Sequence, residues 1–236
     1  MIDQALTVLD LKAGYGKKTV VFGLDFNIPK GNIISILGHN GAGKSTTLMA
    51  ISGLIRPFGG KVVFNGEDVT RLPCAEKARK GLTMIPAEHF TFAPMTVMDN
   101  IRLGGRMVGS PEVKKARLER CYQLFPILED RSNQKAGTLS GGEQRMLSIA
   151  IILMSQPVLL LLDEPSLGLA PAVANDIMTV IRRLVQEDGL SVLFIEQNIP
   201  LALKFADHVY IMRSGRLIFN ETAKNLSNHE RLWDLF

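Results

Sequence analysis

Cysteine and net charge are both scarce in this sequence, and each scarcity excludes a class of protein. The 236 residues include two cysteines, Cys74 and Cys121, which are far apart and show no C-x-x-C spacing. We therefore expect no disulfide framework, but two free, reduced thiols that pack inside a cytoplasmic protein. The net charge of +4 is small, and no long basic run occurs. Nucleic acid is consequently not an expected partner.

Long apolar runs are also missing. The longest apolar region, "IAIILMSQPVLLLLDEP", is divided by Ser155, Gln156 and Pro157 into two pieces, each too short to span a bilayer. The first residues, "MIDQALTVLD", carry acids where a signal peptide has basic residues. We therefore expect a protein that is not embedded in a membrane, although it can sit on a membrane partner.

Hydrophobic periodicity predicts an α/β protein. The opening third alternates with period two and ends its runs in Gly or Pro, which favours strands and an antiparallel β region. Residues 96–125 predict helices with a break at "GSPE", and the tail 221–236 predicts a short amphipathic helix. Later elements are expected as helices over 140–155, 171–187 and 200–205 and strands over 158–162, 191–195 and 209–212. This alternation predicts a mostly parallel central sheet, with an inserted helical lobe at about 96–155.

A glycine-rich stretch carries the first chemical signal. "GHNGAGKS", Gly38 to Ser45, fits the G-x-x-x-x-G-K-[ST] pattern of a phosphate-binding loop, between a predicted buried strand and a predicted helix. Its glycines let successive backbone N–H groups approach one polyphosphate, and the start of the helix adds its positive dipole end. Lys44 is expected to neutralise the β- and γ-phosphates, and the Ser45 hydroxyl is expected to bind Mg²⁺. His39 is expected to contribute only its backbone.

A second signal lies in "VLLLLDEPS". A buried parallel strand brings Asp163 and Glu164 to its carboxyl end, where ligands of open α/β sheets bind. Asp163 is placed to hold Mg²⁺, and Glu164 is placed to orient or deprotonate a water that attacks the γ-phosphate. Two exposed acids at a strand end are a sufficient explanation of this pair in isolation. Its combination with a phosphate loop favours a P-loop NTPase.

A third signal lies in "LSGGEQRMLSIA". Ser140 is typical of a helix N-cap, with Glu143 as its capping-box partner. Capping does not explain the two consecutive glycines, Gly141 and Gly142. Because they lack side chains, the backbone N–H groups at this second helix N-terminus are accessible to an anion.

The three segments, in this order and spacing, resemble the nucleotide-binding subunit of an ATP-binding cassette (ABC) transporter, and the resemblance covers nearly the whole chain. "LSGGE" is the signature of that family. The resemblance implies that residues 1–236 form one nucleotide-binding domain, and that two cassettes pair head to tail. The residues that it implies as a trans contact to the partner's ATP are Ser140, Gly141, Gly142 and Glu143. The residues that it implies around the chain's own ATP are Tyr15, Gly38, His39, Asn40, Gly41, Ala42, Gly43, Lys44, Ser45 and Thr46.

Single positions refine this resemblance. Tyr15, in "GYG", resembles the aromatic residue that stacks on adenine, and an edge tyrosine without that role is the alternative. Most of these ATPases have a histidine at the γ-phosphate after the next strand, and "LFIEQN" puts Gln197 there. Glutamine can hydrogen-bond a phosphate oxygen without carrying charge. "EQN" and "PSLGLAP" resemble the branch that imports branched-chain and other hydrophobic amino acids, amides and urea.

The segment "MIPAEHFTFAPM" departs from the family. A glutamine that contacts Mg²⁺ usually follows its Pro, and here Ala87 takes that place with Glu88 next. Either Glu88 substitutes as a metal ligand after a shift of the loop, or the direct contact is absent. Phe90, Phe92 and Met95 are candidates either for gripping a permease helix or for packing within the helical lobe.

The sequence therefore predicts an ATPase that uses ATP and Mg²⁺, with Glu164, Lys44 and Gln197 as catalytic residues. The expected partners are a second ATPase subunit, membrane permease subunits and, indirectly, a substrate-binding protein, at the cytoplasmic face of the membrane. Branched-chain or other hydrophobic amino acids are the expected cargo. Uptake of urea or amides, export of lipid or lipopolysaccharide, a soluble ATPase without a permease and a nucleotide-binding regulator with little turnover remain alternatives.

Overall fold

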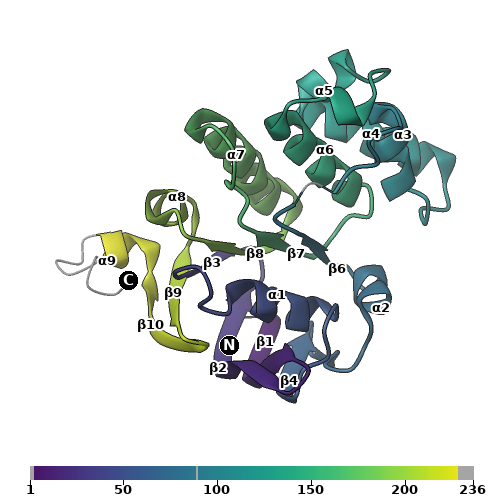
Figure 1. The fold of residues 1–236 in the computed structure, drawn as a ribbon. Helices are drawn as coiled ribbons and strands as arrows, with labels where there is room; N and C mark the ends of the chain where they lie inside the picture. Colours follow the sequence, from purple (N-terminus) through teal and green to yellow (C-terminus); the bar gives the residue numbers. More distant parts are fainter. Residues whose placement is uncertain (1–2, 89, 228–236) are drawn as a thin grey trace.

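The computed structural model describes residues 3–88 and 90–227. Two β-sheets pack around a helix, and a group of helices projects to one side (Figure 1). The smaller sheet is antiparallel, has the strand order β2-β1-β4-β5 and confirms the predicted N-terminal β region. Its strands are β1 (Gln4–Tyr15), β2 (Lys18–Pro29), β4 (Gly59–Phe64) and β5 (Glu67–Asp68).

The larger sheet has the strand order β10-β9-β3-β8-β7-β6. Its strands are β3 (Ile33–Leu37), β6 (Leu82–Ile85), β7 (Leu159–Asp163), β8 (Ser191–Glu196), β9 (His208–Arg213) and β10 (Arg216–Thr222). All neighbours are parallel except β9 and β10, which confirms the mostly parallel sheet. Every residue of β3, β7 and β8 is buried, as expected of parallel strands covered on both faces.

The helices of the described residues fall into two groups. Those next to the sheets are α1 (Lys44–Ser52), α2 (Cys74–Arg79), α7 (Pro171–Asp188), α8 (Ile199–Phe205) and α9 (Ala223–Ser227). The projecting helical lobe contains α3 (Val97–Gly104), α4 (Pro111–Leu124), α5 (Pro126–Asp130) and α6 (Gly141–Leu153), with a 3₁₀ turn at Ala136–Thr138 (Figure 1). The break before α4 was predicted, and Ser110 caps this helix by accepting a hydrogen bond from the Val113 N–H.

Two apolar cores lie on the two faces of the larger sheet, and one of them holds α1. One core joins Leu48 and Ile51 of α1 to residues of both sheets, including Val8 of β1 and Leu161 of β7. The other core covers the opposite face of the larger sheet with residues of α6, α7 and α8. Helix α1 is buried nearly all round, so the loop that precedes it is held between two sheets.

Several elements were not predicted individually from the sequence, among them α2, β6 and β10. Helix α2 and strand β6 are brief, and β6 is recognisable only through its parallel pairing with β7. Strand β10 is half-exposed and pairs antiparallel with β9. Of the helix predicted over 221–236, the structure shows Ala223–Ser227 as α9, whereas Glu221 and Thr222 end β10; residues 228–236 lie outside the described residues. No described helix combines the length and the apolarity that crossing a bilayer requires.

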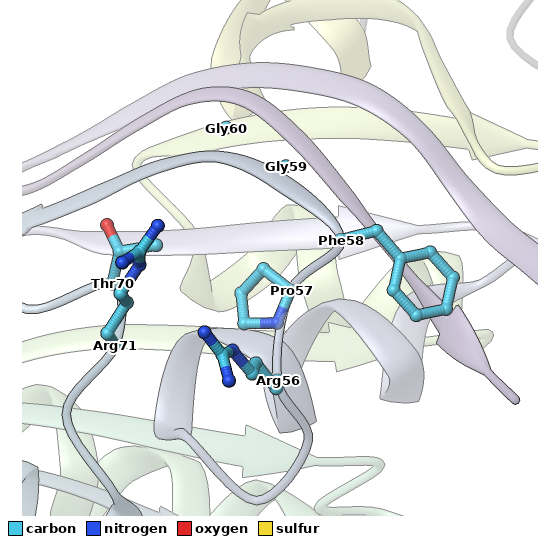
Figure 2. Close-up of a pocket in the computed structure, with 7 residues that line it drawn as sticks. All are labelled: Arg56, Pro57, Phe58, Gly59, Gly60, Thr70 and Arg71. Carbon is cyan, nitrogen blue, oxygen red and sulfur yellow. The ribbon is translucent and has the colours of Figure 1, made fainter.

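A surface hollow lies at the outer edge of the smaller sheet, beyond the end of α1 (Figure 2). It measures about 180 Å³, and Arg56, Phe58, Thr70 and Arg71 are among its lining residues. The hollow shares no residue with the phosphate loop.

Lys77 of α2 is a buried lysine that ties two helices together. Its ammonium donates a 2.7 Å hydrogen bond to the Ile51 carbonyl near the end of α1, and its side chain is fully shielded from solvent. Burial lowers the pKa of Lys77 from 10.5 to about 8. Between these two values the unfolded chain holds a proton that the folded chain has released, so stability attributable to this group increases as pH rises.

We expect the free energy of unfolding of the wild type to rise relative to that of Lys77→Met by about 2 kcal/mol between pH 7.5 and 9.5. Urea unfolding at both pH values measures the difference. Lys80→Met is the matched control, because Lys80 is exposed and pairs with Glu67 at the surface. An equal pH dependence for the wild type and Lys77→Met would contradict the account of Lys77.

Candidate active site

The phosphate loop connects the carboxyl end of β3 to the first turn of α1. Gly41 and Gly43 adopt φ values of 79° and 107°, which residues with a Cβ rarely adopt. A Cβ on Gly38 would lie 2.4 Å from the Met212 carbonyl oxygen, so this glycine is required by the close approach of β9. His39, Asn40 and Gly41 are exposed, and the loop therefore presents its backbone to solvent at the start of α1.

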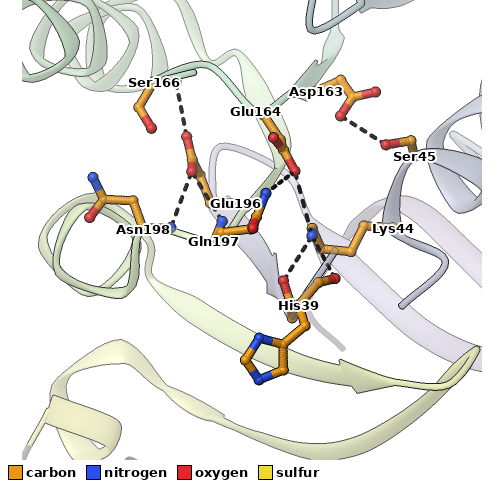
Figure 3. A network of polar contacts seen from close by, with 10 residues as sticks. His39, Lys44, Ser45, Asp163, Glu164, Ser166, Glu196, Gln197 and Asn198 are labelled. Atoms are coloured by element: carbon orange, nitrogen blue, oxygen red, sulfur yellow. Dashed lines mark hydrogen bonds and ion pairs between the residues drawn. The ribbon is translucent and has the colours of Figure 1, made fainter. Parts of the chain in front are cut away.

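Lys44 is buried at the base of this loop, with 4% of its side chain exposed. Its ammonium donates to the Gly38 carbonyl at 2.8 Å and the His39 carbonyl at 3.2 Å, and it lies 3.6 Å from Glu164 Oε1 (Figure 3). Burial lowers the pKa of Lys44, and the nearby Glu164 carboxylate opposes that shift. These contacts hold the lysine ammonium beside the loop.

Ser45, at the start of α1, and Asp163, at the end of β7, lie within hydrogen-bond distance of each other. The Ser45 hydroxyl donates a 3.1 Å hydrogen bond to Asp163 Oδ1, and Asp163 is buried at the end of β7 (Figure 3). Burial raises the pKa of Asp163, while the bond from Ser45 lowers it. Two oxygens about 3 Å apart match neighbouring ligands of an octahedral Mg²⁺, whose bonds measure about 2.1 Å. The donor set therefore fits this ion.

Glu164 and Gln197 form the second half of the site. Gln197 Nε2 donates a 2.8 Å hydrogen bond to Glu164 Oε1, the oxygen that also faces Lys44 (Figure 3). Glu164 has a φ of 41°, an uncommon conformation for a residue with a side chain. The neighbouring parallel strands β7 and β8 carry the two residues at their carboxyl ends, as the sequence predicted.

Two buried charges in this region were not identified from the sequence. The Glu196 carboxylate, at the end of β8, is 3% exposed and accepts hydrogen bonds from the backbone of Ser166, Gln197 and Asn198. Arg145 of α6 donates to the Pro86 carbonyl at 2.5 Å and to the Asp163 carbonyl at 2.9 Å. Charged residues among apolar strand or helix positions were the available signals.

The guanidinium of Arg145 connects three segments in the larger core. It links α6 to the loop after β6 and to the end of β7, and its Nε has no hydrogen-bond partner among the described residues. Burial lowers the pKa of Arg145 to about 10. The helix that follows "LSGGE" is thereby attached directly to the strand that carries Asp163.

Tyr15 lies at the rim of the loop. Half of its side chain is exposed, its hydroxyl lies 3.5 Å from Thr46 Oγ1, and it also contacts Met49 Sδ at 3.4 Å. The exposed ring therefore lies beside the first turn of α1, next to the phosphate loop. This location is suitable for contact with a base attached to the polyphosphate.

The signature residues lie at the N-terminus of α6, in the projecting lobe (Figure 1). Ser140 and Glu143 form the predicted capping box, and Glu143 also pairs with Arg131 at 3.0 Å. A Cβ on Gly142 would lie 2.7 Å from Val173 of α7, so packing also requires a glycine there. Among the described residues, no hydrogen bond or ion pair joins Ser140–Glu143 to the phosphate loop of the same chain.

Glu88 is separate from the magnesium ligands. Its side chain is exposed, and no hydrogen bond or ion pair in the described part of the chain connects it to Ser45 or Asp163. Ala87 next to it has no group that could bind a metal. Asp163 and Ser45 are therefore the oxygens that the structure brings together.

Fold and site together define an ATPase of the P-loop class, in which a loop before a helix binds the phosphates of ATP. The ABC transporter profile matches residues 21–167, and the chain belongs to this family. Its structure superimposes on a crystal structure of a nucleotide-free ATP-binding cassette from an ABC transporter with a TM-score of 0.86 and 26% identity, over 98% of both chains.

Within this family, the chain is similar to ATP-binding proteins of several named transport systems. The chain is 38% identical to the high-affinity branched-chain amino acid transport ATP-binding protein BraG of Pseudomonas aeruginosa, over 94% of both chains. It is also 38% identical to a probable branched-chain amino acid transport ATP-binding protein, LivF, of Archaeoglobus fulgidus, over 96% of this chain and 95% of that protein. The lipopolysaccharide export system ATP-binding protein LptB of Haemophilus influenzae is 33% identical over 96% of this chain and 94% of its own length.

Proposed function

We propose that this chain is the ATP-hydrolysing subunit of an importer for branched-chain or other hydrophobic amino acids. The observation that carries the proposal is the pair Glu164 and Gln197, which meet beside Lys44 at the carboxyl ends of β7 and β8. The similarity to BraG and LivF supports the cargo. Gln197, in place of the more common histidine, also favours this branch over lipopolysaccharide export.

Each residue of the site has a defined task in this proposal. Lys44 and the N–H groups of the loop bind the β- and γ-phosphates, and Tyr15 stacks on adenine. Ser45 and Asp163 hold Mg²⁺, which neutralises phosphate charge when bound. Glu164 orients the attacking water and accepts its proton, and Gln197 donates a hydrogen bond to the γ-phosphate. Glu88 would join these two metal ligands only after a shift of the loop that follows β6.

Residues 1–236 act as one nucleotide-binding domain in this proposal, with the lobe at about 96–155 carrying the signature. A second ATPase subunit binds head to tail, and Ser140, Gly141, Gly142 and Glu143 of each subunit cover the ATP of the other. The exposed start of α6, which has no polar contact to its own phosphate loop among the described residues, supports an action in trans. A related dimeric cassette at 25% identity supports pairing of this kind.

Permease subunits are proposed to bind the segment after β6, which places the chain at the cytoplasmic face of the membrane. Phe90 and Phe92 are 42% and 46% exposed, with ring centroids 6.4 Å apart, so packing inside the lobe does not account for them. The buried Asn100 holds this segment through hydrogen bonds to both backbone groups of Phe92. A fixed pair of exposed aromatic rings suits an apolar helix end of a partner.

Co-purification followed by transport tests the proposed function. Tagged protein is extracted from its native cells in mild detergent, and mass spectrometry identifies the proteins bound to it. We expect two polytopic permeases, and ATP-dependent uptake of leucine or isoleucine after reconstitution in liposomes with a substrate-binding protein. Uptake of urea or an amide in place of these amino acids would refute the proposed cargo. Recovery of the tagged protein without any membrane protein would refute its proposed role in an importer.

A further inference from the structure

Glu196 is a buried carboxylate whose hydrogen bonds all go to the backbone. Its Oε1 accepts from the Ser166 N–H at 2.9 Å, and its Oε2 accepts from the N–H groups of Gln197 at 3.1 Å and Asn198 at 3.3 Å (Figure 3). No salt bridge to Glu196 is present among the described residues, although its side chain is 3% exposed. Burying a charge is costly, so these amide bonds must compensate for the lost solvation.

The three donors belong to two different loops. Ser166 lies in the loop after β7, two residues beyond Glu164, whereas Gln197 and Asn198 begin the loop after β8. The two oxygens of one carboxylate therefore hold the backbone on both sides of the contact between Glu164 and Gln197. Figure 3 shows the Glu196 side chain between these loops, on the side of Glu164 and Gln197 that is away from Lys44.

Capping of α8 does not explain this arrangement. The N-cap of α8 is Asn198, and its side chain already accepts a hydrogen bond from the Leu201 N–H. The bond from Ser166 joins residues 30 positions apart and contributes nothing to that helix. A helix cap would also be satisfied by a neutral acceptor, whereas the two-sided arrangement requires an acceptor at both ends of the group.

We propose that Glu196 is a positioning residue, which fixes the distance between Glu164 and Gln197 by holding both of their loops. This inference rests on the proposed catalytic roles of that pair. A carboxylate is specifically required, because a glutamine at 196 would place an NH₂ group against at least one backbone N–H. The loop with that unpaired N–H would shift, and the hydrogen bond between Gln197 and Glu164 would be lost.

The test is a double-mutant cycle on steady-state ATP hydrolysis by the purified complex. Glu196→Gln is expected to lower kcat by about 10- to 100-fold, with KM for MgATP within about twofold of the wild type. In a Gln197→Ala background the same substitution is expected to have a clearly smaller effect, because the contact that it positions is already lost. An undiminished effect in that background would overturn the proposal, and so would a wild-type kcat for Glu196→Gln.

A matched control separates positioning from general loss of stability. Ser191, at the other end of β8, is also buried and also accepts a backbone hydrogen bond, from the Gly31 N–H at 3.0 Å. Ser191→Ala is expected to lower the melting temperature while kcat stays near the wild-type value. An equal loss of kcat in Ser191→Ala would show that Glu196 has only a structural role.

If Glu196→Gln fails to fold, a second variant and a second measurement test the same proposal. Glu196→Asp retains both oxygens on a shorter side chain, and we expect faster amide hydrogen exchange in peptides that cover 164–168 and 197–199. Unchanged exchange in both loops would overturn the proposal. Lack of hydrolysis by a wild-type complex that binds ATP would overturn the proposed function itself, and the positioning role with it.

Discussion

We expect Glu164→Gln to lower kcat for ATP hydrolysis by at least about 100-fold and to leave ATP binding intact. The neutral amide cannot accept a proton from the attacking water, and a positioned general base typically contributes a factor of about 100 to 10,000. In the wild type, one oxygen of Glu164 is held by Gln197 at 2.8 Å, so the other remains for water. Phosphate release measures kcat, and isothermal titration with MgATP measures the affinity.

Two surface carboxylates serve as controls for this experiment. Glu67 and Glu119 are exposed and form only surface ion pairs, with Lys80 and Lys115. Their replacement by glutamine is expected to leave kcat unchanged. If Glu164→Gln retains more than about a tenth of wild-type turnover, another group must activate the water, and the assignment of Glu164 is wrong.

We expect Lys44→Met to raise the dissociation constant for ATP by about 100-fold. Lys44 is the lysine of the phosphate loop, and hydrogen bonds to the Gly38 and His39 carbonyls hold its ammonium beside the loop. Loss of charge-assisted hydrogen bonds to phosphate costs about 1.5–3 kcal/mol each, which corresponds to one or two orders of magnitude in affinity. Because methionine has a similar volume, the buried position stays filled and folding is expected to be retained.

Equilibrium binding of a fluorescent ATP analogue measures this change. Lys61→Met is the control, because Lys61 is half-exposed and forms a surface ion pair with Asp68, with 3.6 Å between Nζ and Oδ2. Wild-type affinity in Lys44→Met would mean that the loop N–H groups alone bind the phosphates. That result would refute the role of Lys44 in binding.

The parts of the site that the sequence predicted are local in the chain. The loop before α1 and the acids after β7 follow directly from glycine spacing and from a buried strand, so neither requires knowledge of distant contacts. Ser140 and Ser110 were likewise recognisable as helix caps, and the structure confirms both.

The parts that the sequence did not predict depend on contacts between distant segments. Glu196 was visible only as a charged residue at the end of an apolar strand, and its partner Ser166 is 30 residues away. Arg145 lies three and four residues before the buried Ser148 and Ile149, and only the fold brings the Pro86 and Asp163 carbonyls to it. Strand β6 has four residues, too few for a periodic pattern.

The role of Glu88 as a metal ligand stays a prediction. It depends on a shift of the loop after β6, because the Glu88 side chain is exposed in the structure, whereas the other two predicted ligands, Ser45 and Asp163, already lie together. The proposed trans action of Ser140 depends on a second chain, which no pattern within one chain can position.

The initial rate of Mg²⁺-dependent phosphate release by the wild-type complex tests the central claim most directly, namely that this site hydrolyses ATP to drive transport. We expect steady release with MgATP, no release with excess EDTA, and a higher rate when the transported amino acid and its binding protein are present. A complex that binds ATP tightly but releases no phosphate above the EDTA control would contradict the claim, and the chain would then be a nucleotide-binding regulator.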